Sequence, residues 1–378
     1  MKLVFLLGSR GEWGYIRPII ELAIKSGHDV KICATNMSVL SQYGDLSTIL
    51  VAEGYPIDFR ILSSVEGDTV AAMAKSIGLL QISFVDYLQW IRPDWLILAG
   101  DRAEQLAAAV AASYCYIPTA HIQAGEKSGN IDGVARHAIT KFVHLHFASN
   151  EDAHQRLLKM GEEAFRVYTT GAPQIDDIYN TEVISIQKTK EKGVLKDDQP
   201  YCVVCFHPDT DAPDASKAQV RILVDCVNAL ALNSIWILPN NDAGGHYIRD
   251  YILNHIDNNS IAHKNLDRNL YLSLLRHAEF LMGNSSSGIL EAPSLKLPAI
   301  NIGSRQEGRV QGQNVINVSG LSLSELNSAI AKARKLKAEN SLQETVSPYG
   351  DGNSSRRILS ILEKTVISSN FLRKRLTY

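Results

Sequence analysis

The chain has 378 residues, of which 45% are hydrophobic and 21% charged, and its formal net charge at pH 7 is -2. This length predicts two domains, each large enough to bury its own core. The near-neutral charge excludes a strongly basic nucleic-acid binder, so local arginines and helix ends would have to hold any anionic ligand. No apolar run reaches the roughly 20 residues of a membrane span, and the opening MKLVFLLGSRGEWG is typical of a first strand entering a polar loop, not of a signal peptide.

The five cysteines, at positions 33, 115, 202, 205 and 226, are widely spread. Cys202 and Cys205 form a CxxC, but YCVVCF has the pattern of a buried strand, in which residues three apart point to opposite faces. We therefore expect structural thiols, no metal site and a reducing compartment, with the cytoplasm as the default location.

Short apolar runs alternate with helical patterns along the chain. In the first half the expected strands are Lys2–Leu7, Asp29–Ala34, Trp95–Ala99, Thr119–Gln123, His146–Ser149 and Arg166–Thr169, with helices at Tyr15–Lys25, Ala103–Cys115 and Val134–Leu145. After a polar stretch at 178–200, the expected strands are Tyr201–Phe206, Ile235–Leu238, Phe280–Met282 and Ala299–Ile302, with helices near Ser216–Leu232, Asn269–His277 and Ile289–Leu295.

Near-continuous apolar strands joined by helices are typical of α/β domains whose parallel sheet is covered on both faces. We expect two doubly wound, Rossmann-like domains with a cleft between them. The first spans 1–180 and the second 198–355, and 356–378 form a C-terminal helix and tail that could return to the first domain. Ligands of such folds bind at the carboxyl ends of the strands, so the loops that follow strands are where chemistry is expected.

The first of these loops is GSRGEWG, residues 8–14. Its glycines permit a sharp turn from strand to helix, and serve either packing or a ligand. They do not form the GxGxxG motif of dinucleotide-binding domains. The next expected strand, Asp29–Ala34, also has no acidic residue at its end, where such domains bind the ribose. A nicotinamide cofactor is therefore disfavoured, while Arg10 favours a phosphate or sugar contact.

Two further loops of the first half carry titratable groups. In AGDRAEQ, residues 99–105, Asp101 either caps the next helix or is a carboxylate kept ionised near an anionic substrate. In HIQAGEKSGNIDGVARHAITK, residues 121–141, Asp132 and Arg136 have the i,i+4 spacing of a simple ion pair. The high density of titratable and polar residues in that loop nevertheless favours a functional role for some of them. These residues are His121, Gln123, Glu126, Asp132, Arg136 and His137.

The second half has its own polar loops after strands. FHPDT at 206–210 contains His207, which is either structural or functional, and LPNNDAGG at 238–245 offers Asn240. GNSSSGILEAPSL at 283–295 opens a helix with hydroxyls and a glycine, and the free N–H groups of such a helix entrance bind anions. Glu291 follows within reach of a ribose, and GSRQEGR at 303–309 adds Arg305 and Arg309, whose guanidinium groups suit a diphosphate.

These motifs, together with YGDGN at 349–353, occur in an order that resembles the hydrolysing UDP-N-acetylglucosamine 2-epimerases of sialic acid and related nonulosonic acid pathways. The resemblance covers nearly the whole chain. It is weaker to the non-hydrolysing epimerases, whose basic residue soon after the first-loop arginine is not evident here, where Tyr15 stands nearby. It implies a glycosyltransferase-B-like fold, no redox cofactor, UDP on the second domain and a homo-oligomer, either dimer or tetramer.

The resemblance also implies roles for residues. Ligand contacts fall to Arg10, Gly14, Arg102, His207, Asn240, Ser285, Ser286, Glu291 and Arg305. The residue pattern adds Arg136 and Arg309 as substrate-binding candidates, and His207 is also expected to help stabilise the leaving diphosphate. Asp101 and Asp132 match catalytic carboxylates. Where many relatives have a glutamate this chain has Gln123, which cannot exchange a proton, and Glu126 is the nearest carboxylate that could replace it.

The function that follows first is a hydrolysing UDP-N-acetylglucosamine 2-epimerase, which forms N-acetylmannosamine and UDP by elimination to a glycal and hydration. The alternative is the same reaction on a UDP-2,4-diacetamido-2,4,6-trideoxyhexose of a legionaminic-type pathway, a change that Gln123 could report. Two more distant alternatives are a glycosyltransferase of the same fold, which needs an acceptor, and a non-catalytic UDP-sugar sensor.

Overall fold

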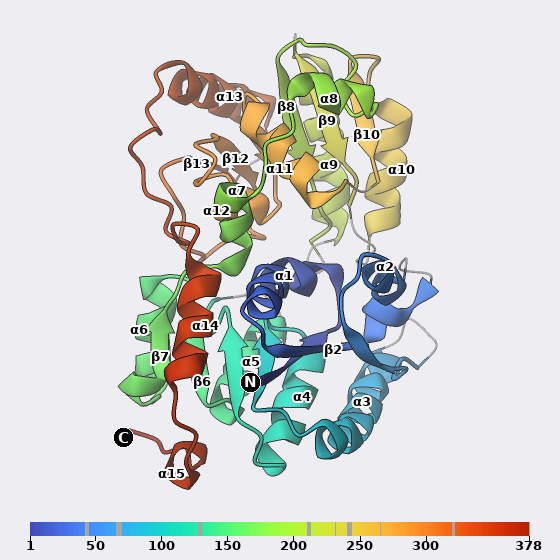
Figure 1. Ribbon diagram of the computed structural model, residues 1–378. Helices are drawn as coiled ribbons and strands as arrows, with labels where there is room; N and C mark the ends of the chain where they lie inside the picture. Colours follow the sequence, from blue (N-terminus) through green and yellow to red (C-terminus); the bar gives the residue numbers. More distant parts are fainter. Residues whose placement is uncertain are drawn as a thin grey trace. The chain divides into compact units, whose positions relative to one another are not determined.

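The computed structural model describes residues 1–41, 45–65, 70–127, 131–209, 213–230, 232–239, 244–264, 266–319 and 322–377. The chain divides into two compact units (Figure 1). The first unit comprises Met1–Asp177 and Tyr349–Tyr378, and the second comprises Ile178–Pro348. Each unit contains one parallel sheet with alternating helices, which confirms the predicted α/β class.

The first unit is built on a seven-stranded sheet with the order β3-β2-β1-β4-β5-β6-β7. The strands are β1 (Lys2–Leu7), β2 (Asp29–Thr35), β3 (Ile57–Ile61), β4 (Trp95–Ala99), β5 (Thr119–Ile122), β6 (Leu145–Ala148) and β7 (Val167–Thr169). The helices are α1 (Arg10–Lys25), α2 (Leu46–Ala52), α3 (Val70–Ile91), α4 (Ala103–Tyr114), α5 (Ile131–Phe142), α6 (Glu151–Lys159), α14 (Ser354–Lys364) and α15 (Ser369–Leu372).

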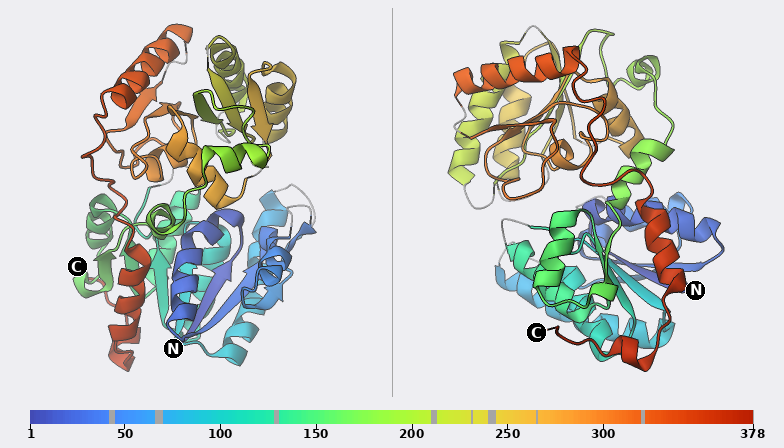
Figure 2. Two further views of the ribbon diagram at one scale, coloured as in Figure 1. Left: turned by 45° about the horizontal axis from the view of Figure 1, so that its top comes forward. Right: turned by 90° about the vertical axis from the view of Figure 1, so that its left-hand side faces the viewer.

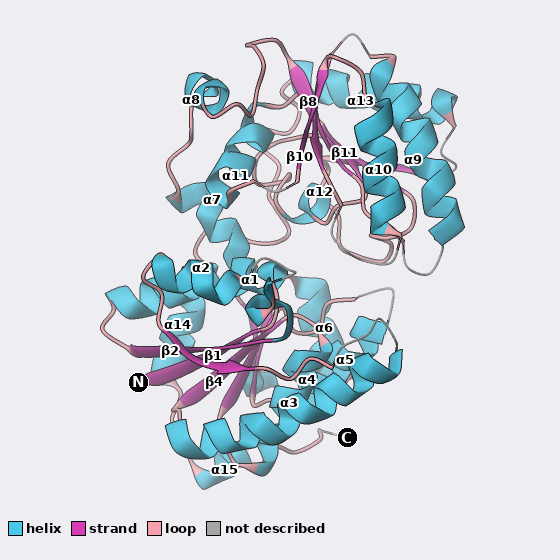
Figure 3. Cartoon of the chain, turned by 90° about the vertical axis from the view of Figure 1, so that its right-hand side faces the viewer, coloured by secondary structure: helices cyan, strands magenta, loops and turns pink. Residues whose placement is uncertain are grey.

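The central strand β1 explains why the strands of this unit are apolar throughout. Leu3, Phe5 and Leu7 pack with residues of α1 and α14 on one face of the sheet. Val4 and Leu6 pack with residues of α3, α4 and α5 on the other face. Figure 3 shows these helices on both sides of the strands. Because both faces are covered, both sets of alternate side chains must be hydrophobic.

The C-terminal residues belong to the first unit. Ile358, Leu359 and Leu362 of α14 lie in the same core as β1 and α1, and Figure 2 shows α14 in red running along this unit. Further on, the carbonyl of Phe371 accepts a hydrogen bond from Nη2 of buried Arg166 over 2.9 Å. The last helices are thus part of the fold of the first unit and not a free extension.

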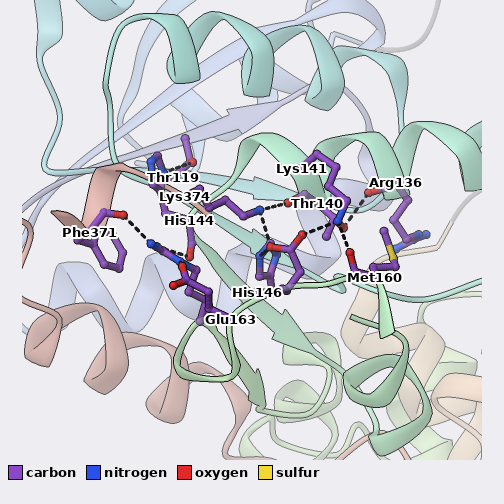
Figure 4. Close-up of polar contacts among 12 residues, drawn as sticks. Thr119, Arg136, Thr140, Lys141, His144, His146, Met160, Glu163, Phe371 and Lys374 are labelled. Atoms are coloured by element: carbon purple, nitrogen blue, oxygen red, sulfur yellow. Dashed lines mark hydrogen bonds and ion pairs between the residues drawn. The ribbon is translucent and has the colours of Figure 1, made fainter. Parts of the chain in front are cut away.

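A buried ion cluster anchors the end of the chain to the sheet (Figure 4). Glu162 lies at 2.6 Å from Nζ of Lys374, 2.9 Å from Nζ of Lys141 and 3.0 Å from Nε2 of His146. Burial raises the pKa of Glu162, but the hydrogen bond from His146 and the charge of Lys374 outweigh it and bring that pKa to about 2. Burial lowers the pKa of His146 to about 4, so a neutral imidazole donates to the carboxylate.

The second unit is built on a six-stranded sheet with the order β10-β9-β8-β11-β12-β13. The strands are β8 (Tyr201–Cys205), β9 (Asn233–Ile237), β10 (Ser260–His263), β11 (Leu281–Gly283), β12 (Ala299–Ile302) and β13 (Val315–Val318). The helices are α8 (Ile186–Glu191), α9 (Pro213–Asn228), α10 (Gly245–His255), α11 (Arg268–His277), α12 (Ser287–Leu290) and α13 (Leu323–Ala338), while α7 (Asp176–Asn180) spans the residue at which the units divide.

The polar stretch 178–200 is part of the second unit. It contains α8, buries Val194 and Leu195, and is held by a hydrogen bond of 2.9 Å from the amide of Ile184 to Oγ of Ser273. All five cysteines are free thiols. Of the helices in the described ranges, none is long and apolar enough to cross a membrane.

Candidate active site

The turn after β4 places Asp101 at the carboxyl edge of the first sheet. The N-cap of α4 is Arg102, without a side-chain cap, so Asp101 does not cap this helix. Asp101 instead forms an ion pair with Arg136, and the side chains are 23% and 4% exposed, respectively. The carboxylate is thus the accessible end of a largely buried pair, at the edge of the sheet where ligands of such folds bind.

Arg136 of α5 holds two neighbouring turns together. Besides pairing with Asp101, it donates through Nη1 to the carbonyl oxygen of Gln123 over 2.6 Å. Gln123 is buried and has a φ of +58°, in the left-handed region that is costly for a residue other than glycine. Arg136 therefore fixes the carboxylate of one predicted site residue and the backbone of another.

His121 supports the turn that carries Asp101. It lies on β5 and is fully buried, and burial lowers its pKa to about 3. The ring is therefore neutral near pH 7 and donates from Nε2 to the carbonyl oxygen of Gly100 over 2.6 Å. Gly100 has a φ of +83°, so this hydrogen bond holds a turn that favours glycine.

Two predicted site residues, Asp132 and Asn240, lie partly or wholly outside the residues that the structure describes. The backbone of Asp132 lies in the first turn of α5, one turn before Arg136, and its side chain lies outside the described residues. Asn240 lies outside them altogether. The catalytic role of Asp132 and the ligand contact of Asn240 stay predictions.

Glu126 is buried among the residues that begin α6. Its Oε1 accepts hydrogen bonds from the hydroxyl of Ser149 and from Nδ2 of Asn150, the latter over 2.8 Å. Asn150 is itself the N-cap of α6 and accepts from the amide of Ala153. These bonds tie Glu126 to the turn between β6 and α6, as expected of a structural anchor.

The loop after β1 is shorter than the glycine spacing predicts. Helix α1 begins at Arg10 because Ser9 and Glu12 form a capping box, so Gly14 lies inside the helix and not in a loop. Arg10 is exposed in the first turn of α1. A side chain at Gly14 would meet nothing within 4 Å, so packing does not explain this glycine.

Two buried acidic side chains, Glu12 and Glu104, lie next to Gly8 of this loop. Oε2 of Glu12 accepts from the amides of Gly8 and Ser9 over 2.6 and 3.0 Å. Glu104 of α4 is also buried and lies 3.3 Å from Nε of Arg102. Burial, followed by the charge of Glu104, raises the pKa of Glu12 to about 8, so this carboxyl group is largely protonated at neutral pH.

In the second unit, Asn284 joins the loops after β8 and β11. Its Oδ1 accepts from the amide of His207 over 2.7 Å, and its Nδ2 donates to the carbonyl oxygen of His207 over 2.8 Å. The preceding residue must be glycine, because a Cβ on Gly283 would lie 2.0 Å from the carbonyl oxygen of Cys205. His207 is therefore held by its backbone at the carboxyl edge of this sheet.

The helix in the serine-rich segment after β11 differs from the one predicted near Ile289–Leu295. Helix α12 is a single turn that begins at Ser287 and ends at Leu290, and Ser286 occupies its N-cap without a side-chain cap. Ser285 and Ser286 are both half-buried. Because the macrodipole of one turn is small, anion binding here would depend on the serine hydroxyls, local N–H groups and nearby arginines.

The arginines after β12 are anchored near the same segment. Nη1 of Arg305 and Nε2 of Gln306 both donate to the carbonyl oxygen of Asn284, over 3.3 and 3.0 Å. Nη1 of Arg309 donates to Oε1 of Gln306 over 3.1 Å. Asn284 and Gln306, neither of which the sequence analysis singles out, thus connect His207 to both arginines.

Glu291 directly follows α12 and is 6% exposed. Its Oε1 lies 3.3 Å from both Nη1 and Nη2 of Arg268, the first residue of α11. The described residues of the second unit that were predicted to bind a ligand therefore lie in the loops after β8, β11 and β12 and directly after α12. The sequence did not point to Arg268, whose contact with Glu291 is visible only in the structure.

A family model described as UDP-N-acetylglucosamine 2-epimerase matches residues 21–363. The chain belongs to this family. It is 33% identical, over 99% of its length, to a UDP-N,N'-diacetylbacillosamine 2-epimerase (hydrolyzing) of Legionella pneumophila, of which 98% is covered. It is 30% identical, over 84% of its length, to a UDP-N-acetylglucosamine 2-epimerase of Neisseria meningitidis, of which 83% is covered.

The fold agrees with this membership. The chain is similar to the crystal structure of a UDP-GlcNAc 2-epimerase from Neisseria meningitidis bound to UDP-GlcNAc, with a TM-score of 0.79 and 19% identity over 97% of this chain and 100% of that one. The predicted glycosyltransferase-B-like architecture and the predicted family are both confirmed. As a member of the UDP-N-acetylglucosamine 2-epimerase family, the chain is an enzyme of the UDP-sugar 2-epimerase type.

Proposed function

We propose that this epimerase is of the hydrolysing kind and converts a UDP-linked 2-acetamido sugar into UDP and the free sugar with carbon 2 inverted. The observation that carries the proposal is the Asp101 carboxylate, partly exposed and held by buried Arg136 at the carboxyl edge of the first sheet. A carboxylate in that position can accept a proton from a bound sugar. The relative of this chain in Legionella pneumophila is named as a hydrolysing enzyme, which supports release of the free sugar by hydrolysis.

The chemistry requires a strong pull on the leaving group, because the hydrogen on carbon 2 has no adjacent carbonyl and is barely acidic. The bond between carbon 1 and the diphosphate oxygen breaks, and its electron pair leaves with UDP. A base then takes the proton from carbon 2, and the C–H electron pair forms the double bond of a glycal. Water finally adds its hydroxyl to carbon 1 while a proton reaches carbon 2 from the opposite face.

The second unit would stabilise the departing UDP. We assign the diphosphate to His207, Ser285, Ser286, Arg305 and Arg309, because fixed donors stabilise charge that develops in a transition state. The shared anchoring of His207 and Arg305 on Asn284 supports this assignment, since it fixes the backbone of His207 and the guanidinium group of Arg305 before a ligand binds. We assign Glu291 to the ribose hydroxyls and Asn240 to a further polar contact.

The first unit would handle the proton. We assign the base to Asp101 and the acid to Asp132, with sugar contacts from Arg10, Gly14 and Arg102. Gln123 cannot transfer a proton. We do not assign the acid–base role of the glutamate that it replaces to Glu126, because the buried Glu126 carboxylate already accepts hydrogen bonds from Ser149 and Asn150. Arg136 would position Asp101 and Gln123, not bind the sugar itself.

Two substrates are open, and we favour the UDP-2,4-diacetamido-2,4,6-trideoxyhexose. The relative named for that type of sugar is 33% identical over nearly the entire length of both chains. The second candidate is UDP-N-acetylglucosamine, which the sequence analysis places first. It is favoured by the Neisseria meningitidis relative of that name, at 30% identity over a shorter match.

A side-by-side assay of the two UDP sugars tests this proposal. We expect both UDP and a free sugar from the diacetamido substrate. Its kcat/KM should be at least about 10-fold above that for UDP-N-acetylglucosamine, because a site that binds one additional polar substituent can discriminate by at least this factor. A reversed ratio would select the second candidate. A UDP-linked epimer that is not hydrolysed, from either sugar, would refute the hydrolytic reaction.

A further inference from the structure

The two oxygens of the Glu291 carboxylate have different surroundings. Oε1 lies 3.3 Å from each terminal nitrogen of Arg268. Oε2 is buried and has no hydrogen-bond partner among the residues that the structure describes. Buried polar atoms are nearly always satisfied, so this oxygen, on a residue that is only 6% exposed, calls for a donor beyond the described residues, and a ligand hydroxyl can supply one.

Arg268 is suited to hold this carboxylate in one orientation. It begins α11, whose start is fixed by Asp267, the N-cap that accepts from the amides of Asn269 and Leu270. The side chain of Arg268 is 25% exposed and that of Glu291 is 8% exposed, so the arginine lies on the more open side of the pair. Because both guanidinium nitrogens reach the same oxygen, the carboxylate cannot rotate freely about its last torsion, and Oε2 keeps its position.

We propose that Arg268 is a positioning residue that orients Glu291 so that Oε2 receives a ribose hydroxyl, and that it thereby gives the enzyme its preference for ribonucleotides over 2′-deoxyribonucleotides. The inference rests on the proposed binding of UDP by the second unit. A hydroxyl that donates to a charged and largely desolvated acceptor changes affinity by about 10- to 100-fold. Without Arg268, Glu291 can turn away, and this share of the affinity is lost for UDP but not for its 2′-deoxy analogue.

The test is calorimetric titration of the full chain with UDP and with 2′-deoxy-UDP, which needs no turnover. The wild type should bind UDP at least about 10-fold more tightly than 2′-deoxy-UDP. R268Q should bring that ratio close to one, mainly by weakening UDP. R268K keeps the charge but has a single terminal nitrogen, so its ratio should lie between those of R268Q and the wild type.

The matched control is R276Q. Arg276 lies on the same helix and is exposed, and its Nη2 donates to the carbonyl oxygen of Ile178. This variant removes the same charge from α11 and should leave the nucleotide ratio unchanged. Thermal unfolding of each variant, measured alongside, identifies any that fails to fold, and R268K then carries the test.

The outcomes separate this inference from the proposed function. A wild type that does not discriminate, or an R268Q variant that weakens both nucleotides equally or neither, overturns the positioning role of Arg268. Discrimination that is lost in R268Q supports it even if no sugar is released in the product assay, in which case only the hydrolytic epimerase proposal fails.

Discussion

Replacing Asp101 by asparagine should reduce kcat about 1,000-fold, within the range that general acid–base groups contribute. Asparagine keeps the size and the oxygen that faces Arg136 but cannot accept the proton of carbon 2 as a base. The affinity for UDP alone should change by less than about twofold, because the residues proposed to hold UDP lie in the second unit. Steady-state kinetics with the preferred sugar and calorimetry with UDP measure the two effects separately.

The chain offers a matched control for this substitution in an ion pair of α6 whose carboxylate is exposed. Asp152 contacts Arg156 at 2.6 Å, and its side chain is 49% exposed. D152N therefore makes the same chemical change in a pair of the same type and should leave kcat near the wild-type value. If D101N lowered kcat and UDP affinity by the same factor, Asp101 would be a structural residue and the proposed base would have to be another group.

Replacing Arg136 by methionine should destabilise the first unit by about 3 kcal/mol. Removing one partner of a buried pair leaves a charge with no compensation, which typically costs about 3–5 kcal/mol; the lower end applies because Asp101 is 23% exposed. The same variant frees the carbonyl of Gln123 from its hydrogen bond of 2.6 Å, so the turn with the left-handed backbone should loosen as well.

Hydrogen exchange of peptides from β4 and β5 is the measurement of choice for R136M, because it reports on the first unit separately from the second. R357M is the control, since the side chains of the Arg357–Asp351 pair are 43% and 56% exposed, and this pair should contribute about 1 kcal/mol or less. Equal loss of protection in the two variants would contradict the view that Arg136 organises the turns after β4 and β5.

The parallel sheets were predictable from the sequence because their central strands are apolar on both faces. β1 and β4 are buried along almost their whole length, and their predicted bounds agree with the structure. The edge strands β3, β10 and β13 escaped prediction for the opposite reason, and most of β13 is half-buried or exposed. Arg60 and Phe59 of β3 are exposed, and most of β10 is half-buried, so none of these strands shows a continuous apolar run.

The loops after strands were predictable as the location of polar groups, but their contacts were not. Asp101 and Arg136 are 35 positions apart, and no local pattern shows that they pair. Glu126 appeared as a possible acid because sequence spacing says nothing of Ser149 and Asn150, which bury it. The start of α1 at Arg10 could have been recognised from Ser9 and Glu12, whose spacing is that of a capping box.

Arg268 carried no signal in the sequence. It lies in a polar stretch at the start of α11, and its importance depends on Glu291, 23 positions further along. Asn284 is similar, since an asparagine after a strand is common, and only the paired hydrogen bonds to His207 reveal that it joins two loops. Such tertiary contacts depend on how the sheet brings distant loops together, which local periodicity does not encode.

Removal of the hydrogen from carbon 2 is the chemical step that every assigned role serves. The measurement that tests it is NMR of the products after the wild-type chain acts on its UDP sugar in deuterated water. We expect free sugar with inverted carbon 2, deuterium at that carbon and one equivalent of UDP. Inverted sugar that still carries its original hydrogen at carbon 2 would contradict proton abstraction by Asp101 or by any other base.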